Sequence, residues 1–232
     1  MTASEDLFTP IHKGLRSMLY DLSGRLQTND FADRAATERL AVDLEREFEA
    51  ARSAACVLCI FAKHAEDEET AIFGEVAKVE PRLVHRLIEE HRDLAQRELE
   101  LGRRTREIAA LDDPTKRIVA GAELNRTANA LIGAYLTHMN LEETDLVPRM
   151  QEHFTDAQML AMRGAIMGQM PPDRLFAILR WMLPSLNATE LTDLLRSARP
   201  GIPPPVFQKI TDLCEARVNP GIWSEVRSRI GA

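Results

Sequence analysis

Apolar residues recur along the chain at steps of three, four and seven, which is the spacing of an amphipathic α-helix. The first such stretch begins at Thr9 and Pro10, an N-cap residue followed by a proline at the first helical position, and ends in a loop at residues 28–30. No run of β-branched or aromatic residues alternates with polar ones as in a half-buried strand, so the pattern predicts an all-α fold. Three longer stretches predict helices over residues 37–79, 81–111 and 113–148.

Beyond Pro148 the pattern changes to short helices that are interrupted by prolines. Thr155 with Gln158, and Asn187 with Glu190, have the spacing of a capping box, which marks the start of a helix. The apolar residues of this segment are too numerous to remain in water, so it either caps the long helices or forms an interface with a second copy or another protein. The predicted short helices cover residues 155–169, 172–183, 188–197, 204–217 and 221–229.

Composition and charge narrow the possible function classes. The net charge is −7 and no basic stripe with interleaved aromatic residues is present, so nucleic acid is not an expected partner. The longest apolar run, residues 54–62, is too short to cross a membrane, so no membrane partner is expected. The first residues are acidic and lack the order of a secretory signal, so we expect a cytoplasmic protein.

Cys56 and Cys59 form a Cys-x-x-Cys pair within this apolar run. The chain has three cysteines, an odd number that argues against a disulfide framework. The pair lies inside a helical pattern and not at the turn between a strand and a helix, where a redox motif would be expected. We interpret both thiols as buried core residues.

Two histidine–glutamate pairs are the clearest candidates for chemistry. His64 and Glu68 lie in the second predicted helix, and His138 and Glu142 lie in the fourth. A spacing of four places both members of a pair on one face of a helix, about 6 Å apart along its axis. Two such helices that face each other can enclose a metal ion.

His12 and His91 fall on the apolar faces of the first and third helices, so each long helix presents one inward histidine. Carboxylates buried without a partner are costly, so the inward Glu68 and Glu142 must be neutralised. Two divalent metal ions shared by the two carboxylates would achieve this. Imidazole combined with carboxylate favours iron, zinc or manganese, and two bridging carboxylates favour a di-iron centre.

The chain contains His12 within Pro-Ile-His-Lys-Gly-Leu-Arg, His64-x-x-x-Glu68, His91 within Glu-Glu-His-Arg-Asp-Leu, and His138-x-x-x-Glu142. This combination resembles the hemerythrin-like (HHE cation-binding) family. It is most similar to the hemerythrin domains of plant iron-responsive ubiquitin ligases and of the related animal F-box iron sensor. The likeness to the plant proteins continues through residues 153–155 and 179–185, although no zinc-finger or ligase module is present.

The resemblance implies an antiparallel up-down four-helix bundle over residues 1–153 and a helical C-terminal appendage over residues 154–232. It also implies two non-haem iron ions with carboxylate and oxo or hydroxo bridges, with positions left open for O2 or a small oxidant. In this assignment, the ligands are His12 and His64 on one iron, His91 and His138 on the other, and Glu68 and Glu142 as bridges.

Two departures from the invertebrate oxygen carriers change the expected function. Leu87 stands where those proteins have a further histidine, and Glu142 stands four residues after His138, where they have an aspartate at five. A site with four histidines instead of five disfavours simple O2 carriage and favours sensing of O2, redox state or iron supply. The alternatives are an enzyme that acts on peroxide, nitric oxide or ferrous iron, and a metal-free helical adaptor.

Residues one helical turn from the ligands are predicted to shape the pocket. Tyr135 either donates its hydroxyl to a bound oxygen species or packs in the core. Phe61, Leu87 and Leu94, together with Leu15, are expected to line a dry pocket.

Other polar residues near the predicted ligands are expected to face solvent. His85 lies six residues before His91, which rotates it off the inward stripe. Glu98 is at a compatible position but is expected to be solvated. The same is expected of the acidic residues on the flanks of the second helix, of which one is a possible accessory ligand: Glu66, Asp67 and Glu69.

Overall fold

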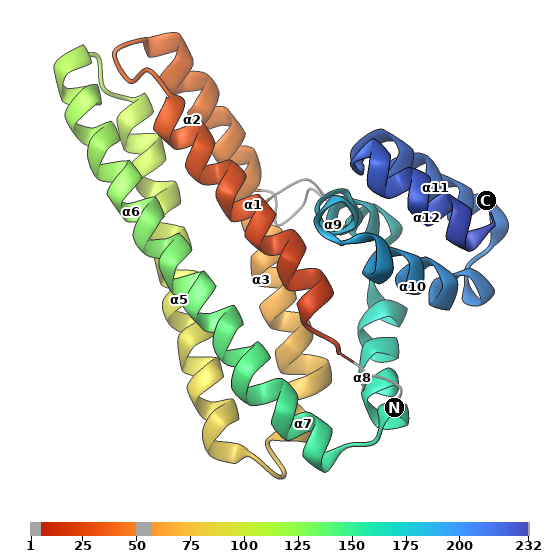
Figure 1. Ribbon diagram of the computed structural model, residues 1–232. Helices are drawn as coiled ribbons and strands as arrows, with labels where there is room; N and C mark the ends of the chain where they lie inside the picture. Colours follow the sequence, from red (N-terminus) through yellow and green to blue (C-terminus); the bar gives the residue numbers. More distant parts are fainter. Residues whose placement is uncertain (1–5, 50–56, 232) are drawn as a thin grey trace. The chain divides into compact units, whose positions relative to one another are not determined.

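The computed structural model describes residues 6–49 and 57–231, and all of its regular elements are helices, which confirms the predicted all-α class. The long helices (Figure 1) are α1 (Thr9–Thr28), α2 (Arg34–Glu49), α3 (Val57–Glu68), α5 (Pro81–Ala109) and α6 (Pro114–Leu141). Shorter elements join or follow them: η1 (Glu69–Phe73), α4 (Gly74–Val76), η2 (Glu142–Leu146), α7 (Val147–His153) and α8 (Asp156–Gln169). The C-terminal elements are α9 (Pro172–Ser185), α10 (Ala188–Ala198), η3 (Arg199–Gly201), α11 (Pro204–Arg217) and α12 (Pro220–Ile230).

Two sequence predictions fall outside the described residues. One is the continuity of the helix predicted over residues 37–79, because residues 50–56 separate α2 from α3. The other is the burial of Cys56 and of the Cys59 side chain. None of the described helices combines the length and the apolar character that a membrane span requires.

The chain forms two compact units, and α1 contributes to both. One unit contains residues 19–170 together with residues 1–7, and the other contains residues 8–18 together with residues 171–232. The predicted domain boundary after residue 153 stays a prediction.

In the first unit, α5 packs along both α2 and α6, and α3 packs against α2 and α5. The buried positions of α5 follow the predicted stripe, with Leu87, His91, Leu94 and Leu101 removed from water. Asp113 caps α6, because its side chain accepts hydrogen bonds from the backbone of the first turn. The positions of the long helices thus follow from their apolar faces and from the polar residues at their ends.

Both histidine–glutamate pairs are followed by a π-helical segment, which the sequence pattern did not predict. In η1 this segment begins directly after Glu68, and in η2 it begins at Glu142 itself. The helix predicted to end near Pro148 instead continues as α7, so that boundary was wrong. Pro148 lies in the first turn of α7, where the preceding π-helical segment has already altered the hydrogen-bond pattern.

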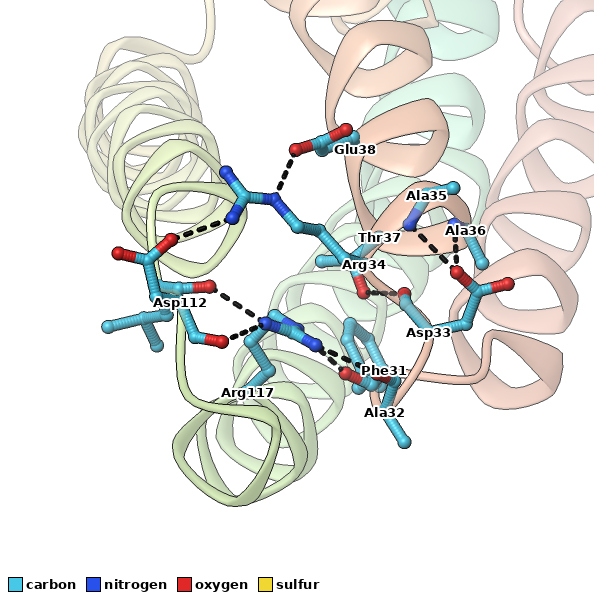
Figure 2. Close-up of polar contacts among 11 residues, drawn as sticks. Phe31, Ala32, Asp33, Arg34, Ala35, Ala36, Thr37, Glu38, Asp112 and Arg117 are labelled. Atoms are coloured by element: carbon cyan, nitrogen blue, oxygen red, sulfur yellow. Dashed lines mark hydrogen bonds and ion pairs between the residues drawn. The ribbon is translucent and has the colours of Figure 1, made fainter.

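Two loops of the first unit are joined by one buried arginine (Figure 2). Arg117, in the first turn of α6, donates hydrogen bonds to the carbonyl oxygens of Phe31 at 3.2 Å and Ala32 at 2.8 Å. It also donates to the carbonyl oxygens of Leu111 at 2.9 Å and Asp112 at 2.8 Å. The guanidinium therefore links the α1–α2 loop to the α5–α6 loop through four backbone acceptors.

Close packing also holds the α1–α2 loop against α6. A Cβ atom on Gly121 would lie 2.3 Å from ring atoms of Phe31, so only glycine allows the ring to sit against α6. Arg34 bridges the loops at the surface, 2.7 Å from both Glu38 and Asp112.

The second unit has its own apolar core, in which α9 packs on α11 and α10 packs on α12. The two capping boxes at Thr155 and Asn187 are confirmed at the starts of α8, in the first unit, and α10. Within the second unit, the first turns of α1 approach α9 closely, because a Cβ on Gly14 would lie 3.0 Å from backbone atoms of Met182. Lys13 also pairs with Glu190 at 2.5 Å.

We expect Arg117→Met to lower the free energy of unfolding by about 3 kcal/mol, because it removes charge-assisted hydrogen bonds from four backbone carbonyls. Urea denaturation would measure the change. Arg97→Met is the control, since Arg97 pairs with Asp93 on an exposed helix face and its loss should cost less than about 1 kcal/mol. Equal losses in the two variants would contradict the role of Arg117.

Candidate metal centre

Five polar side chains of the first unit converge at one place in its interior. His64 and Glu68 lie in the last turns of α3, His91 lies in α5, and His138 and Glu142 lie at the junction of α6 and η2. Glu68 is 1% exposed and Glu142 is 0% exposed. Their burial confirms that both glutamates point inward, as the i,i+4 spacing predicts.

Each of the two carboxylates lies between imidazole rings. The oxygens of Glu68 are 2.9 Å from Nε2 of His64 and 3.3 Å from Nε2 of His91. Oε1 of Glu142 is 3.2 Å from Nε2 of His138 and 4.0 Å from Nε2 of His91. The rings of His91 and His138 meet edge to face, with 4.7 Å between their centroids. His91 thus lies between both carboxylates, and all three imidazoles direct Nε2 into the cluster.

These groups have the composition and spacing of a metal site. One ligand atom from each of Glu68, His91, His138 and Glu142 lies within 4.8 Å of the other three. Opposite ligands of a six-coordinate ion are about 4.2 Å apart when each bond is about 2.1 Å, so a small contraction would bring all four atoms into coordination. Imidazole and carboxylate together suit iron, zinc and manganese. The cluster can therefore hold a metal ion.

Further carboxylates bind the outer nitrogens of two of these histidines. Nδ1 of His91 is 2.8 Å from Oε1 of Glu69, and Nδ1 of His138 is 2.9 Å from Oε2 of Glu90. A carboxylate at Nδ1 holds a proton on that nitrogen and orients the ring, so that Nε2 is the atom presented to the cluster. Metal-binding histidines characteristically have such an outer partner.

The carboxylates also determine the charge of the histidines. Burial lowers the pKa of His138, but hydrogen bonding to Glu142 and then to Glu90 outweighs burial and raises the pKa to about 9. For His91, burial again lowers the pKa, whereas Glu68 and Glu69 raise it, and the net direction is upward. A metal ion bound at Nε2 would have to displace a proton, so metal affinity should increase with pH.

The sequence did not predict that either outer carboxylate binds a histidine, although Glu69 was one of three residues considered as a possible accessory ligand. Glu69 was placed on a flank, and its side chain is indeed 41% exposed, yet it reaches a histidine on a different helix. Glu90 was not singled out at all. Each is the immediate chain neighbour of a predicted ligand, Glu68 or His91, and so it points about 100° away from that ligand around the helix. Only the packing of one helix against another brings each residue to its histidine.

Tyr135 and Glu98 form a second buried polar group. The Tyr135 hydroxyl donates a hydrogen bond to Oε1 of Glu98, and the Tyr135 ring lies 4.4 Å from the ring of Phe61 between centroids. The expectation that Glu98 is solvated was wrong, because it is only 8% exposed. Burial raises the pKa of Glu98 to about 7, although the hydrogen bond from Tyr135 acts in the opposite direction.

The predicted pocket residues Phe61, Leu87, Leu94 and Tyr135 are all buried in the first unit. Donation by Tyr135 to a bound oxygen species stays a prediction. Phe73, which sequence analysis did not identify, stacks on the ring of His91 with 5.5 Å between centroids and 15° between planes.

The other histidines of the chain are His12, His85 and His153, and His153 lies in α7 with its Nε2 atom 3.7 Å from Glu80. His12 lies in the first turn of α1, within the second unit, where it is buried and its ring is 5.6 Å from that of Phe8. Its assignment as a metal ligand stays a prediction. His85 is exposed, as its rotation off the inward stripe of α5 predicts.

We expect the effect of Glu98→Gln on stability to depend on pH. The pKa of Glu98 is raised from 4.5 to about 7 by folding, so below 4.5 the side chain is neutral in both states and folding involves no charge burial. Between pH 4.5 and 7 the unfolded state increasingly gains by ionising, so the wild type loses up to about 3 kcal/mol relative to the variant. Urea denaturation across this range would measure the difference. A difference that does not change with pH would contradict the assignment.

We expect Glu90→Gln to weaken Zn²⁺ binding by about 10- to 100-fold, because the amide orients and polarises His138 less well than the carboxylate does. Competition with a chromophoric chelator would measure the affinity. Glu89→Gln is the matched control, since the neighbouring Glu89 is exposed and pairs with Arg92. The role of Glu90 would be disproved if both variants bound Zn²⁺ as tightly as the wild type.

Comparison of the chain with family models, curated proteins and solved structures returns no match. The interpretation of the cluster therefore depends on its own residues and distances. These residues can hold a metal ion, and they lie on helices that are far apart in the sequence.

Proposed function

We propose that the protein is hemerythrin-like and binds a non-haem di-iron centre through which it senses O2, redox state or iron supply. The proposed architecture is an antiparallel up-down four-helix bundle whose helices are α1, α2 with α3, α5, and α6. The single observation that carries this proposal is the convergence of Glu68, His91, His138 and Glu142 from separate helices into one buried cluster.

The charge of the cluster supports a bound cation. Two buried carboxylates, Glu68 and Glu142, are accompanied by Glu69 and Glu90 at its edge, and only three histidines of the first unit face these groups. Arg86 lies 2.8 Å from Glu90, so the remaining three carboxylates leave a net negative charge unless all three imidazoles are protonated. Divalent metal ions would neutralise this charge and would stabilise the folded state.

The ligand types support iron over the alkaline-earth cations, and shared carboxylates support a pair of ions. In this proposal Glu68 and Glu142 bridge the ions, His91 and His138 bind one of them, and His64 binds the other. By the family resemblance, His12 would be a further ligand of the second ion. Iron bound in this way would supply one-electron redox chemistry at positions open to O2 or a small oxidant, while Phe61, Leu87 and Leu94 would limit the entry of water.

We expect the protein to bind about two iron ions per chain when Fe²⁺ is added without O2. Glu68→Ala and Glu142→Ala should each reduce the iron content to less than half, because each variant removes a ligand shared by both ions. Circular dichroism should show that helicity is largely retained. Glu66→Ala is the control, since Glu66 is exposed and pairs with Lys63.

Two results would contradict the proposal. Full iron content in both the Glu68 and Glu142 variants would disprove the bridging assignment. A wild-type protein that binds no iron would disprove the di-iron function and would favour a metal-free helical adaptor.

A further inference from the structure

Glu98, which is hydrogen-bonded to Tyr135, is the one buried carboxylate in the described part of the first unit for which the metal proposal gives no role. Tyr135 belongs to α6 and Glu98 to α5, and the phenol donates its hydrogen bond directly to the carboxylate. Both side chains are buried, with residue exposures of 7% for Tyr135 and 8% for Glu98. A polar pair in such a place stabilises the fold less than apolar residues of similar size, so its chemistry needs an explanation.

The position of the pair connects it to the candidate metal cluster. Tyr135 precedes His138 by three residues on α6, which is less than one helical turn. Phe61, whose ring packs on Tyr135, likewise precedes His64 by three residues on α3. On α5, which packs along α6, Glu98 follows His91 by about two turns. Three helices thus place the pair in the layer directly next to the cluster.

We propose that Tyr135 is a redox-active tyrosine and that Glu98 is its proton acceptor. This inference rests on the proposed di-iron function, because the oxidant is the iron site after its reaction with peroxide or O2. Tyr135 gives one electron to that site, and the phenolic proton moves along the existing hydrogen bond to the Glu98 carboxylate. The products are a neutral tyrosyl radical and a neutral carboxylic acid, and the site is reduced by one electron.

The environment favours this transfer over simple loss of a proton. Burial, with the nearby charges of Glu98 and Glu68, raises the pKa of Tyr135 well above its usual value, so the phenol does not ionise by itself. Burial also makes Glu98 a stronger base than an exposed carboxylate, with its pKa raised to about 7. Oxidation of the pair removes a negative charge from an apolar region, which lowers the desolvation cost of the folded state.

The chain contains two tyrosines, and the second provides a matched control. Tyr20 lies in α1 and is 58% exposed. A radical formed at Tyr20 would be open to solvent and to other molecules. A radical at Tyr135 would be enclosed by Phe61 and the apolar core.

The experiment uses the full chain loaded with Fe²⁺ without O2 and then mixed with hydrogen peroxide at about pH 8, where Glu98 is largely ionised. Samples are frozen at intervals, and electron paramagnetic resonance detects any tyrosyl radical, while iron content and iron oxidation are measured in the same samples. We expect a tyrosyl signal in the wild type and in Tyr20→Phe, and no such signal in Tyr135→Phe.

Glu98→Gln tests the proton acceptor separately. This variant keeps an oxygen that can accept the tyrosine hydrogen bond, but an amide is too weak a base to take the proton. We expect the radical yield to fall by at least about tenfold, with iron content and iron oxidation unchanged. A purely structural role for Glu98 would leave the yield at the wild-type level.

Three outcomes would overturn the inference. The first is iron that binds and is oxidised in the wild type without a tyrosyl radical, which leaves the proposed function intact. The second is a radical that persists in Tyr135→Phe, or one whose yield is unaffected in Glu98→Gln. The third is a wild-type protein that binds no iron, which overturns the proposed function as well and is recognised from the iron content.

Discussion

The structure of the first unit depends on two carboxylates that are removed from water and held against imidazole rings. Glu68 and Glu142 are among the most deeply buried charged residues described, and each can remain there only while histidines face its oxygens. This requirement fixes the positions of α3, α5 and α6 along their axes. A shift of one helical turn would move an imidazole by about 5.4 Å and leave a carboxylate buried without it. Stability and the capacity to bind metal thus depend on the same contacts.

The polar groups form layers around these carboxylates. Inside, imidazole Nε2 atoms face Glu68 and Glu142, and at the edge Glu69 and Glu90 hold the Nδ1 atoms. Contacts at both ring nitrogens give His91 and His138 a fixed orientation before any ion binds. This orientation lowers the conformational entropy that is lost on binding. Tyr135 extends the polar region in another direction through its hydrogen bond to Glu98. Among the described contacts of Glu98 there is no arginine or lysine.

The π-helical segments are part of the same arrangement. Each begins at or directly after the glutamate of a histidine–glutamate pair, so the backbone changes its hydrogen-bond pattern where the polar cluster ends. Segments of this kind carry an extra residue per turn and are frequent at functional sites. The insertion changes the direction of the following side chains, including Glu69, which contacts His91 from η1. Neither segment could be predicted from apolar periodicity, because each is only five residues long, which is too short to display a period.

The sequence by itself determined the helical class, most helix ends and the inward direction of Glu68, His91, His138 and Glu142. Local rules suffice for these features, since apolar periodicity, capping residues and prolines act within a few residues of one another. The tertiary structure alone decided the rest: the partners of the histidine Nδ1 atoms, the burial of Glu98, and the loops gathered by Arg117. These contacts join residues from different helices or loops, and the register between two helices depends on how all their side chains pack. That register cannot be read from either helix separately.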